Sequence, residues 1–126
     1  MKKRLVTGGG HTLAVIASET PVITDARSAL DLMATLRYED GCDGLVLPKE
    51  AIAGDFFRLS TGLAGEILQK FVNYRMKLAI VGDFSGYQSK PLHDFITECN
   101  RGNAIFFVPD EAAAIDRLTG TREVTG

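Results

Sequence analysis

The sequence predicts a single α/β domain with a mixed, largely parallel sheet and the element order β-β-α-β-α-β-α-β-α. Three short, continuous apolar runs are typical of strands buried on both faces, and they occupy residues 44–47, 78–81 and 105–108. Segments with a helical spacing of apolar residues separate these runs. Two further apolar runs flank a glycine turn near the start of the chain, which predicts an antiparallel hairpin. Strands that alternate with helices imply right-handed crossovers and parallel pairing.

Length, charge and the length of the apolar runs indicate one domain and argue against nucleic-acid and membrane partners. The chain has 126 residues, enough for one domain, and we expect that domain over residues 1–118, with a fraying polar tail over 119–126. Lys and Arg number 14 against 16 Asp and Glu, a balance that argues against a nucleic-acid partner. The apolar runs are too short for a signal peptide or a membrane span. Cys42 and Cys99 match no metal spacing. We therefore expect a cytoplasmic protein with reduced thiols and no membrane partner.

The first half of the chain follows the predicted order closely. The hairpin has its tip at residues 8–10, which are all glycine. Asp25 is a predicted N-cap, because its carboxylate can accept hydrogen bonds from the free amides of the next turn. The helix after it should end near Gly41. The first buried strand is then closed by Pro48.

The second half repeats the alternation of helix and strand. The connection over 49–59 contains Phe56 and Phe57, which we expect to close the core over a second helix at about 61–74. Ser89 is a predicted cap of the third helix. His93 follows in that helix, and we expect it to lie on the solvated surface.

Polar side chains follow the predicted parallel strands at the point where each strand ends. Ligand sites in open α/β sheets form beyond the carboxyl ends of the strands, and the second helix should begin at this same edge. The sequence therefore predicts a ligand edge formed by Lys49, Glu50, Asp83, Ser85 and Asp110, with Ser60, Thr61 and Gly62 at the helix start beside it.

The Ser60-Thr61-Gly62 turn allows two interpretations. Ser60 or Thr61 can simply be the N-cap of the second helix. Alternatively, because the free amides and the dipole of a helix start favour an anion, the turn can bind an anion or present a phosphoacceptor hydroxyl. A phosphate would add about −1.5 to −2 charge and could block or create a docking surface.

Glu50, Asp83 and Asp110 also allow two interpretations. Together they could hold Mg²⁺ or act as acid and base, because a hard cation prefers oxygen ligands. Acidic residues at strand ends more often form loops and helix caps, and we expect that role. Neither histidine lies near a nucleophile in the sequence, so a hydrolase triad has no support. We assign no catalytic residue, no metal ligand and no cofactor.

Three segments resemble a bacterial family of unknown function, domain-of-unknown-function family 4180. Residues 55–71 read DFFRLSTGLAGEILQKF, residues 79–85 read AIVGDFS, and residues 100–102 read NRG. The resemblance covers about residues 13–118. It implies a small, mostly single-domain bacterial protein with no established activity.

The element order is also similar to the STAS domain, the fold of anti-sigma-factor antagonists and sulfate-transporter tails. In that family a strand leads to a turn reading Asp-Ser-Ser-Gly-Leu, at which a helix begins. Residues 59–63 resemble this turn, with Leu59 in place of the Asp. The resemblance implies that Thr61 corresponds to the family's phosphorylated Ser and Ser60 to the preceding Ser.

These observations predict a non-enzymatic regulatory or protein-interaction domain. It would dock a protein partner through the edge at the second helix, under the control of a kinase that modifies Thr61 or Ser60. The alternative is a small enzyme, or a binder of a small molecule or metal, that uses the carboxylates of Asp83 and Glu50. A homodimer formed through an exposed sheet edge or helix face stays open.

Overall fold

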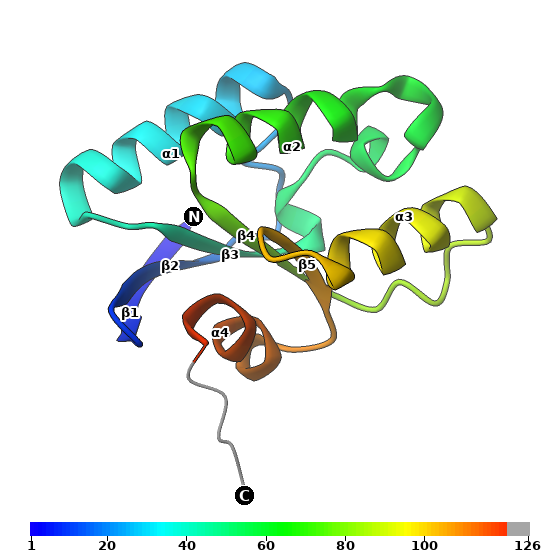
Figure 1. The fold of residues 1–126 in the computed structure, drawn as a ribbon. Coiled ribbons are helices and arrows are strands. Elements are labelled where there is room, and N and C mark those ends of the chain that lie inside the picture. Colours follow the sequence, from blue (N-terminus) through cyan, green and yellow to red (C-terminus); the bar gives the residue numbers. More distant parts are fainter. Residues whose placement is uncertain (121–126) are drawn as a thin grey trace, which may run out of the picture.

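The computed structural model describes residues 1–120, and within them one five-stranded sheet forms in the order β1-β2-β3-β4-β5 (Figure 1). Only β1 is antiparallel to its neighbour, and the remaining pairs are parallel. The predicted mixed α/β class and element order are therefore confirmed. The strands are β1 Lys2–Gly8, β2 His11–Ala17, β3 Gly44–Pro48, β4 Lys77–Val81 and β5 Ile105–Val108.

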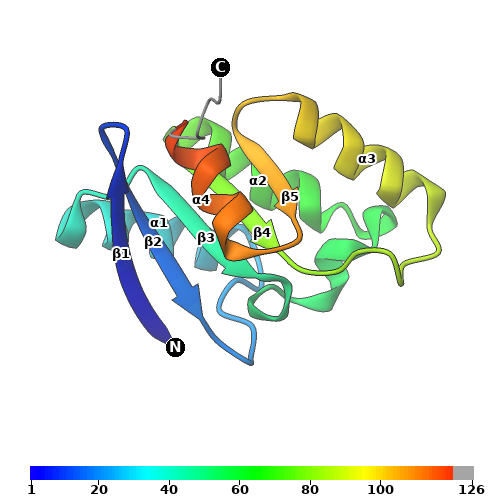
Figure 2. The same ribbon diagram turned by 90° about the horizontal axis from the view of Figure 1, so that it is seen from below.

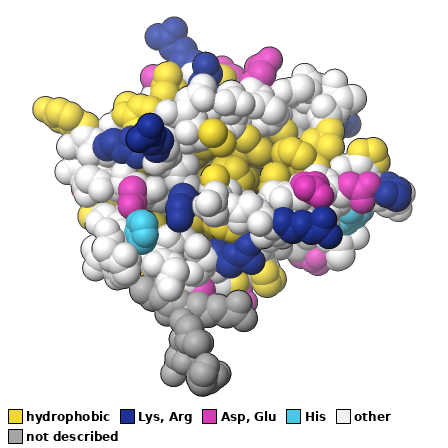
Figure 3. All heavy atoms as spheres, in the orientation of Figure 1, with side chains coloured by type: hydrophobic (Ala, Val, Ile, Leu, Met, Phe, Trp, Pro, Cys, Tyr) yellow, Lys and Arg dark blue, Asp and Glu magenta, His cyan; other side chains and the backbone are white. Residues whose placement is uncertain are grey.

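Helices cover both faces of the sheet (Figures 1 and 2). Alternate strand residues face the larger core cluster, to which α1, α2 and α3 contribute. The intervening residues, among them Val46 and Phe106, face a smaller cluster built with α4. On the face drawn in Figure 3, hydrophobic side chains gather between α2 and α3. The helices are α1 Ala26–Asp40, α2 Leu63–Tyr74, α3 Lys90–Arg101 and α4 Glu111–Thr119.

The hairpin and the first helix form as the local sequence dictates. Gly9 and Gly10 have φ values of 57° and 81°, which suits a two-residue turn with left-handed positions. Asp25 caps α1 by accepting a hydrogen bond from the backbone N–H of Ser28 at 2.7 Å, and Ser28 returns a capping contact. The left-handed Gly41 ends the helix. Both predicted helix signals are confirmed.

The connection between β3 and α2 consists of three 3₁₀ turns, Lys49–Ala51, Gly54–Phe57 and Leu59–Thr61. Phe56 and Phe57 are buried under α2, as predicted. The helix begins at Leu63, two residues later than the sequence indicates, because Gly62 adopts a left-handed φ of 76° and separates the last 3₁₀ turn from the helix.

The side chain of Asn100 closes the outer edge of β5. Its amide oxygen accepts from the N–H of Phe107 at 2.7 Å, and its amide nitrogen donates to the carbonyl of the same residue at 3.1 Å. These two bonds satisfy backbone groups that an edge strand otherwise exposes to another chain. The described end of α3 therefore protects one edge of the sheet.

The last helix extends to the predicted boundary of the domain. Asp110 caps α4 through a 2.8 Å hydrogen bond from the backbone N–H of Ala113. The helix ends at Thr119, which is buried, and Gly120 follows in a left-handed conformation. The predicted tail over 119–126 thus begins with a helical residue, and its last six residues lie outside the described part of the chain. No described helix combines the length and apolarity needed to cross a membrane.

Candidate functional site

A surface hollow of about 390 Å³ lies where the connection before α2 faces the loop that leads into α3. Ser60 and Tyr87 lie on its two sides, and we call it the Ser60–Tyr87 hollow. Ser60 is exposed, and its hydroxyl has no hydrogen-bond partner among the described residues. The predicted helix start therefore does meet the edge that follows β4. The lining residues are Phe57, Arg58, Leu59, Ser60, Tyr87, Gln88, Ser89 and Pro91.

Thr61 differs from Ser60 because its hydroxyl is fully engaged with the backbone. It donates to the carbonyls of Asp55 and Arg58 at 2.9 and 2.8 Å. Its oxygen also accepts from the N–H of Leu63, the first residue of α2, at 3.2 Å. Neither Ser60 nor Thr61 is the N-cap, which is Gly62 with no side-chain hydrogen bond. The capping interpretation is therefore wrong about the position, which the left-handed glycine occupies, although Thr61 still satisfies one free amide of the helix start from one residue earlier.

We expect Thr61→Val to lower the free energy of unfolding by about 1–2 kcal/mol, because the isosteric side chain leaves the carbonyl and amide partners of the hydroxyl without it. Ser60→Ala is the matched control and should change stability by less than about 0.5 kcal/mol. Urea denaturation followed by circular dichroism measures both. Equal effects at the two positions would show that the Thr61 hydroxyl does not hold the turn together.

Lys49 contacts the residues that form one side of the hollow. Its ammonium group donates to the carbonyl of Asp83 at 2.8 Å and lies 5.4 Å from the centre of the Tyr87 ring. That ring stacks on Phe57 with centroids 5.4 Å apart and also packs beside Phe84. The predicted neighbours Lys49 and Asp83 are therefore brought together, and they fix Tyr87 against the buried aromatic side chains.

Asp83 and Ser85 form a local turn within the loop after β4. The Ser85 hydroxyl donates to the Asp83 carboxylate at 2.6 Å, and the Ser85 backbone N–H donates to the same oxygen at 2.9 Å. These donors, the hydroxyl first, lower the pKa of the Asp83 carboxyl below its ordinary value of 3.8. Both predicted residues are thus engaged in holding the shape of the loop.

The lowered pKa of Asp83 predicts how this turn responds to acid. Because the folded pKa is lowered, the stabilisation is present above the unfolded pKa and is lost as pH falls through the folded pKa. The NMR shift of the Ser85 amide should therefore titrate with a midpoint below 3.8. Ser85→Ala should move the Asp83 midpoint upward. An unchanged midpoint in that variant would contradict the assigned cause.

The remaining predicted edge residues do not join one cluster. Asp110 caps α4, and Glu50 is exposed in the first 3₁₀ turn with no polar partner in the described chain. Among residues 1–120, no group of three or more His, Cys, Asp or Glu side chains is arranged to hold a metal ion. Burial raises the pKa of the Cys42 and Cys99 thiols, which disfavours the nucleophilic thiolate.

The sequence interpretation missed the other side of the hollow. His93 was expected on the solvated surface, but its ring is half-buried and its Nε2 contacts the carbonyl of Tyr87. Gln88 lies in no motif, and Arg58 lies in the 55–71 segment without any feature that marked it as a site residue. The one available signal was Tyr87 followed by the Ser89 cap, which places an aromatic ring just ahead of a helix start.

The fold and this site define a small mixed α/β domain with a hollowed surface at the carboxyl ends of its parallel strands. The chain belongs to the family described as Domain of unknown function (DUF4180), whose model matches residues 8–118. This match confirms the resemblance to that family and begins slightly earlier than predicted. Neither the curated proteins nor the solved structures gave a match.

Proposed function

We propose that this chain is a regulatory protein-interaction domain of the bacterial cytoplasm, and that the Ser60–Tyr87 hollow is its docking surface. The observation that carries the proposal is the free hydroxyl of Ser60 in a hollow whose opposite side is held rigid. Tyr87 is fixed by Phe57, Phe84 and Lys49, so a partner meets a preorganised aromatic ring. Preorganised anchors of this kind contribute most of the affinity at protein interfaces.

Phosphorylation at this surface would have different consequences at the two hydroxyls. A phosphate on Ser60 breaks no hydrogen bond, and Arg58, which forms no ion pair with a described carboxylate, lies in the same hollow. A phosphate on Thr61 removes the proton that the Asp55 and Arg58 carbonyls share and opens the turn. We therefore propose Ser60 as the hydroxyl that changes docking by charge alone, and Thr61 as one whose modification unfolds the connection.

The resemblance to the STAS family supports a phosphate switch at this turn, although it points to Thr61 rather than Ser60. The element order and the turn at residues 59–63 are the features that resemble this family. The hydroxyl that corresponds to the family's modified Ser is Thr61. The hydrogen bonds of Thr61 favour Ser60 as the residue that a kinase can modify without first rearranging the backbone.

Mass spectrometry of protein purified from its native host with phosphatase inhibitors tests the modification directly. We expect a phosphopeptide with the phosphate on Ser60. Ser60→Glu should change the capture of the docking partner several-fold, because it places a negative charge in the hollow. Thr35→Glu is the matched control, since Thr35 is an exposed hydroxyl on α1, and it should leave capture unchanged.

Two results together would show that docking is not controlled at Ser60 or Thr61. If Ser60 and Thr61 both stay unmodified, and Ser60→Glu and Thr61→Glu capture the partner as well as the unsubstituted chain does, neither hydroxyl controls docking. No observation in the structure favours the alternative of a small enzyme, because Glu50 and Asp110 do not converge with Asp83 on one cluster.

A further inference from the structure

The outer edge of β1 is an unpaired strand edge. Within the described part of the chain β1 pairs only with β2, and β1 lies at the margin of the sheet in Figure 2, where the end of α1 projects past it on one face of the sheet. Seven residues run in unbroken register from Lys2 to Gly8. An edge of this length without a bulge or proline is a ready template for pairing with another strand.

The register shows which backbone groups face outward. The two-residue turn is closed by the pair Gly8 and His11, and in such a hairpin the closing pair exchanges hydrogen bonds. Hydrogen-bonded and non-bonded pairs then alternate along an antiparallel ladder. Lys3, Leu5 and Thr7 therefore direct their N–H and C=O groups away from β2, toward the open edge.

At the opposite margin of the sheet, side chains occupy backbone groups of the edge strand. At β5 the Asn100 side chain occupies both the N–H and the C=O of Phe107, and Arg117 reaches across to the Asn100 carbonyl. No described side chain makes an equivalent pair of bonds to the backbone of β1. One edge is therefore blocked and the other is open, which selects β1 as the edge that can accept a strand.

Cationic side chains usually discourage pairing at an edge strand, but two of the three cations of β1, Lys3 and Arg4, already have partners, and only Lys2 at the start of the strand has no ion pair among the described residues. Lys3 forms ion pairs with Asp40 and Glu39 in the last turn of α1. Arg4 forms one with Glu111 of α4 at 2.8 Å. Leu5, between Arg4 and Val6, is 45% exposed although it is a large apolar side chain. The middle of the open edge is thus apolar, and the charges of Lys3 and Arg4 beside it are paired within the chain.

We propose that two copies of this chain form a dimer by antiparallel pairing of β1 with β1 of the second copy, centred on Leu5. In this register Leu5 lies opposite its own counterpart, and Lys3 lies opposite Thr7, so no cation faces a cation. The two five-stranded sheets become one continuous sheet about a two-fold axis. The isologous contact satisfies the outward backbone groups of both chains at once.

This dimer leaves the Ser60–Tyr87 hollow free, because none of its lining residues belongs to β1. A dimer would present two hollows on one particle. The inference does not depend on the proposed function, because the pairing rests only on β1 and its ion pairs.

The mass in solution is the first test. Light scattering after size-exclusion chromatography should give twice the 13.6 kDa of one chain. Leu5→Pro removes the central outward donor while leaving the bonds to β2 intact, and it should raise the dimer dissociation constant roughly 30-fold through two symmetric hydrogen bonds. Leu5→Thr keeps that donor and should stay dimeric. A monomeric wild-type chain, or a dimer unaffected by Leu5→Pro, overturns the proposal.

Disulfide crosslinking tests the register without relying on a proline variant. In a Cys99→Ser background, Leu5→Cys places two thiols opposite each other, with Cα atoms about 5.5 Å apart, within reach of a disulfide. Thr7→Cys is the matched control, because its two copies would lie about 14 Å apart along the strands. Crosslinking of Leu5→Cys alone supports the register. Crosslinking of Thr7→Cys alone, or of neither variant, overturns it.

Discussion

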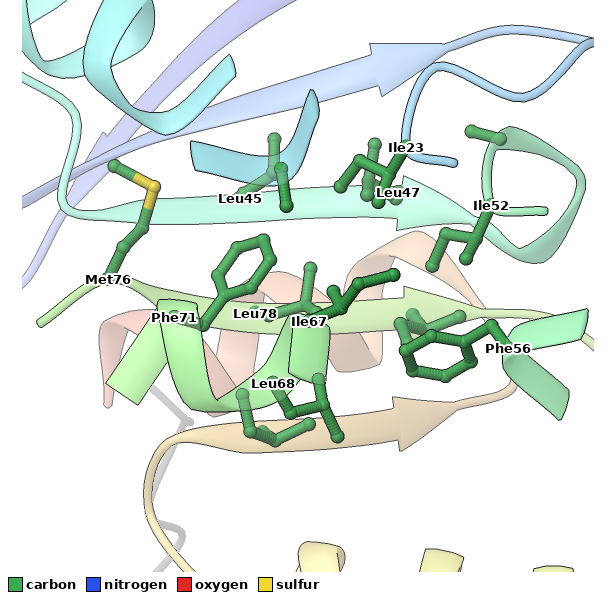
Figure 4. Packing of buried hydrophobic residues seen from close by; sticks show 14 of the residues in the cluster. Ile23, Leu45, Leu47, Ile52, Phe56, Ile67, Leu68, Phe71, Met76 and Leu78 are labelled. Atoms are coloured by element: carbon green, nitrogen blue, oxygen red, sulfur yellow. The ribbon is translucent and has the colours of Figure 1, made fainter. Parts of the chain in front are cut away.

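Phe56→Ala should lower the free energy of unfolding by about 3–5 kcal/mol, the usual cost of removing a fully buried phenylalanine ring. Phe56 has no exposed surface. Its ring meets Phe57 edge-on at 5.0 Å and lies 6.5 Å from Phe107 of β5. Figure 4 shows this ring projecting from the connection before α2 over the carboxyl ends of the strands. The substitution therefore opens a cavity between the sheet and the connection that carries Ser60.

Urea denaturation measures the loss, with Tyr38→Ala as the control, since Tyr38 is 91% exposed. The control should change stability by less than about 0.5 kcal/mol. A loss below about 1 kcal/mol for Phe56→Ala would mean that the connection from residue 49 to residue 62 is not packed as described. The position of Ser60 would then lose part of its support, because backbone pairing with Ile23 holds the connection only around Ile52, and the later 3₁₀ turns rest on this aromatic contact.

Asn100→Ala should lower the free energy of unfolding by about 1–3 kcal/mol, because the N–H and C=O of Phe107 lose their partners. Asn100→Asp should lower the free energy of unfolding by a similar amount. Its carboxylate can still accept from the N–H of Phe107, but it repels the carbonyl oxygen of the same residue, which is also an acceptor. Asn103→Ala, an exposed position beyond the end of α3, is the control. Thermal denaturation measures all three variants.

The same Asn100 variants open the edge of β5 to other chains. We expect Asn100→Ala to form larger assemblies than the unsubstituted protein at equal concentration, because the freed backbone groups can accept a strand. Light scattering at increasing concentration measures this. If Asn100→Ala is as stable and as little associated as the Asn103→Ala control, the amide does not close the edge.

The sequence was sufficient to predict the strands and the helices between them. The runs at residues 44–47, 78–81 and 105–108 are continuous and apolar because both faces of the sheet are covered, by the larger cluster on one face and by α4 on the other. Asp25 and Ser89 mark helix starts through short-range hydrogen bonds. Such contacts lie within a few residues of each other, so a local pattern contains them.

The connection before α2 could not be predicted in the same way. Its three 3₁₀ turns have no periodicity, and they are set by the burial of Phe56 and Phe57 against strands distant in the sequence. The left-handed conformation of Gly62 is equally invisible to a capping rule that looks for Ser or Thr. The sequence therefore left open whether Ser60 or Thr61 caps the helix or presents a free hydroxyl, and the structure engages the hydroxyl of Thr61 and leaves that of Ser60 without a partner among the described residues.

The composition of the hollow also depends on contacts between distant segments. Ser60 meets Tyr87 only because the loop after β4 folds back, held by the contact of Lys49 with the Asp83 carbonyl and by the contact of His93 with the Tyr87 carbonyl. The topological rule for strand ends predicted the edge but not which side chains share it. Glu50 and Asp110 satisfy the rule and still lie outside the hollow.

Site-specific photocrosslinking in the native host shows whether a protein partner docks in the Ser60–Tyr87 hollow. A p-benzoylphenylalanine at position 88, on the wall of the hollow, should form a protein adduct. The same group at position 112, exposed on α4, should not, and Ser60→Glu should change the yield at position 88. No adduct from position 88, or an equal adduct from position 112, would contradict the account.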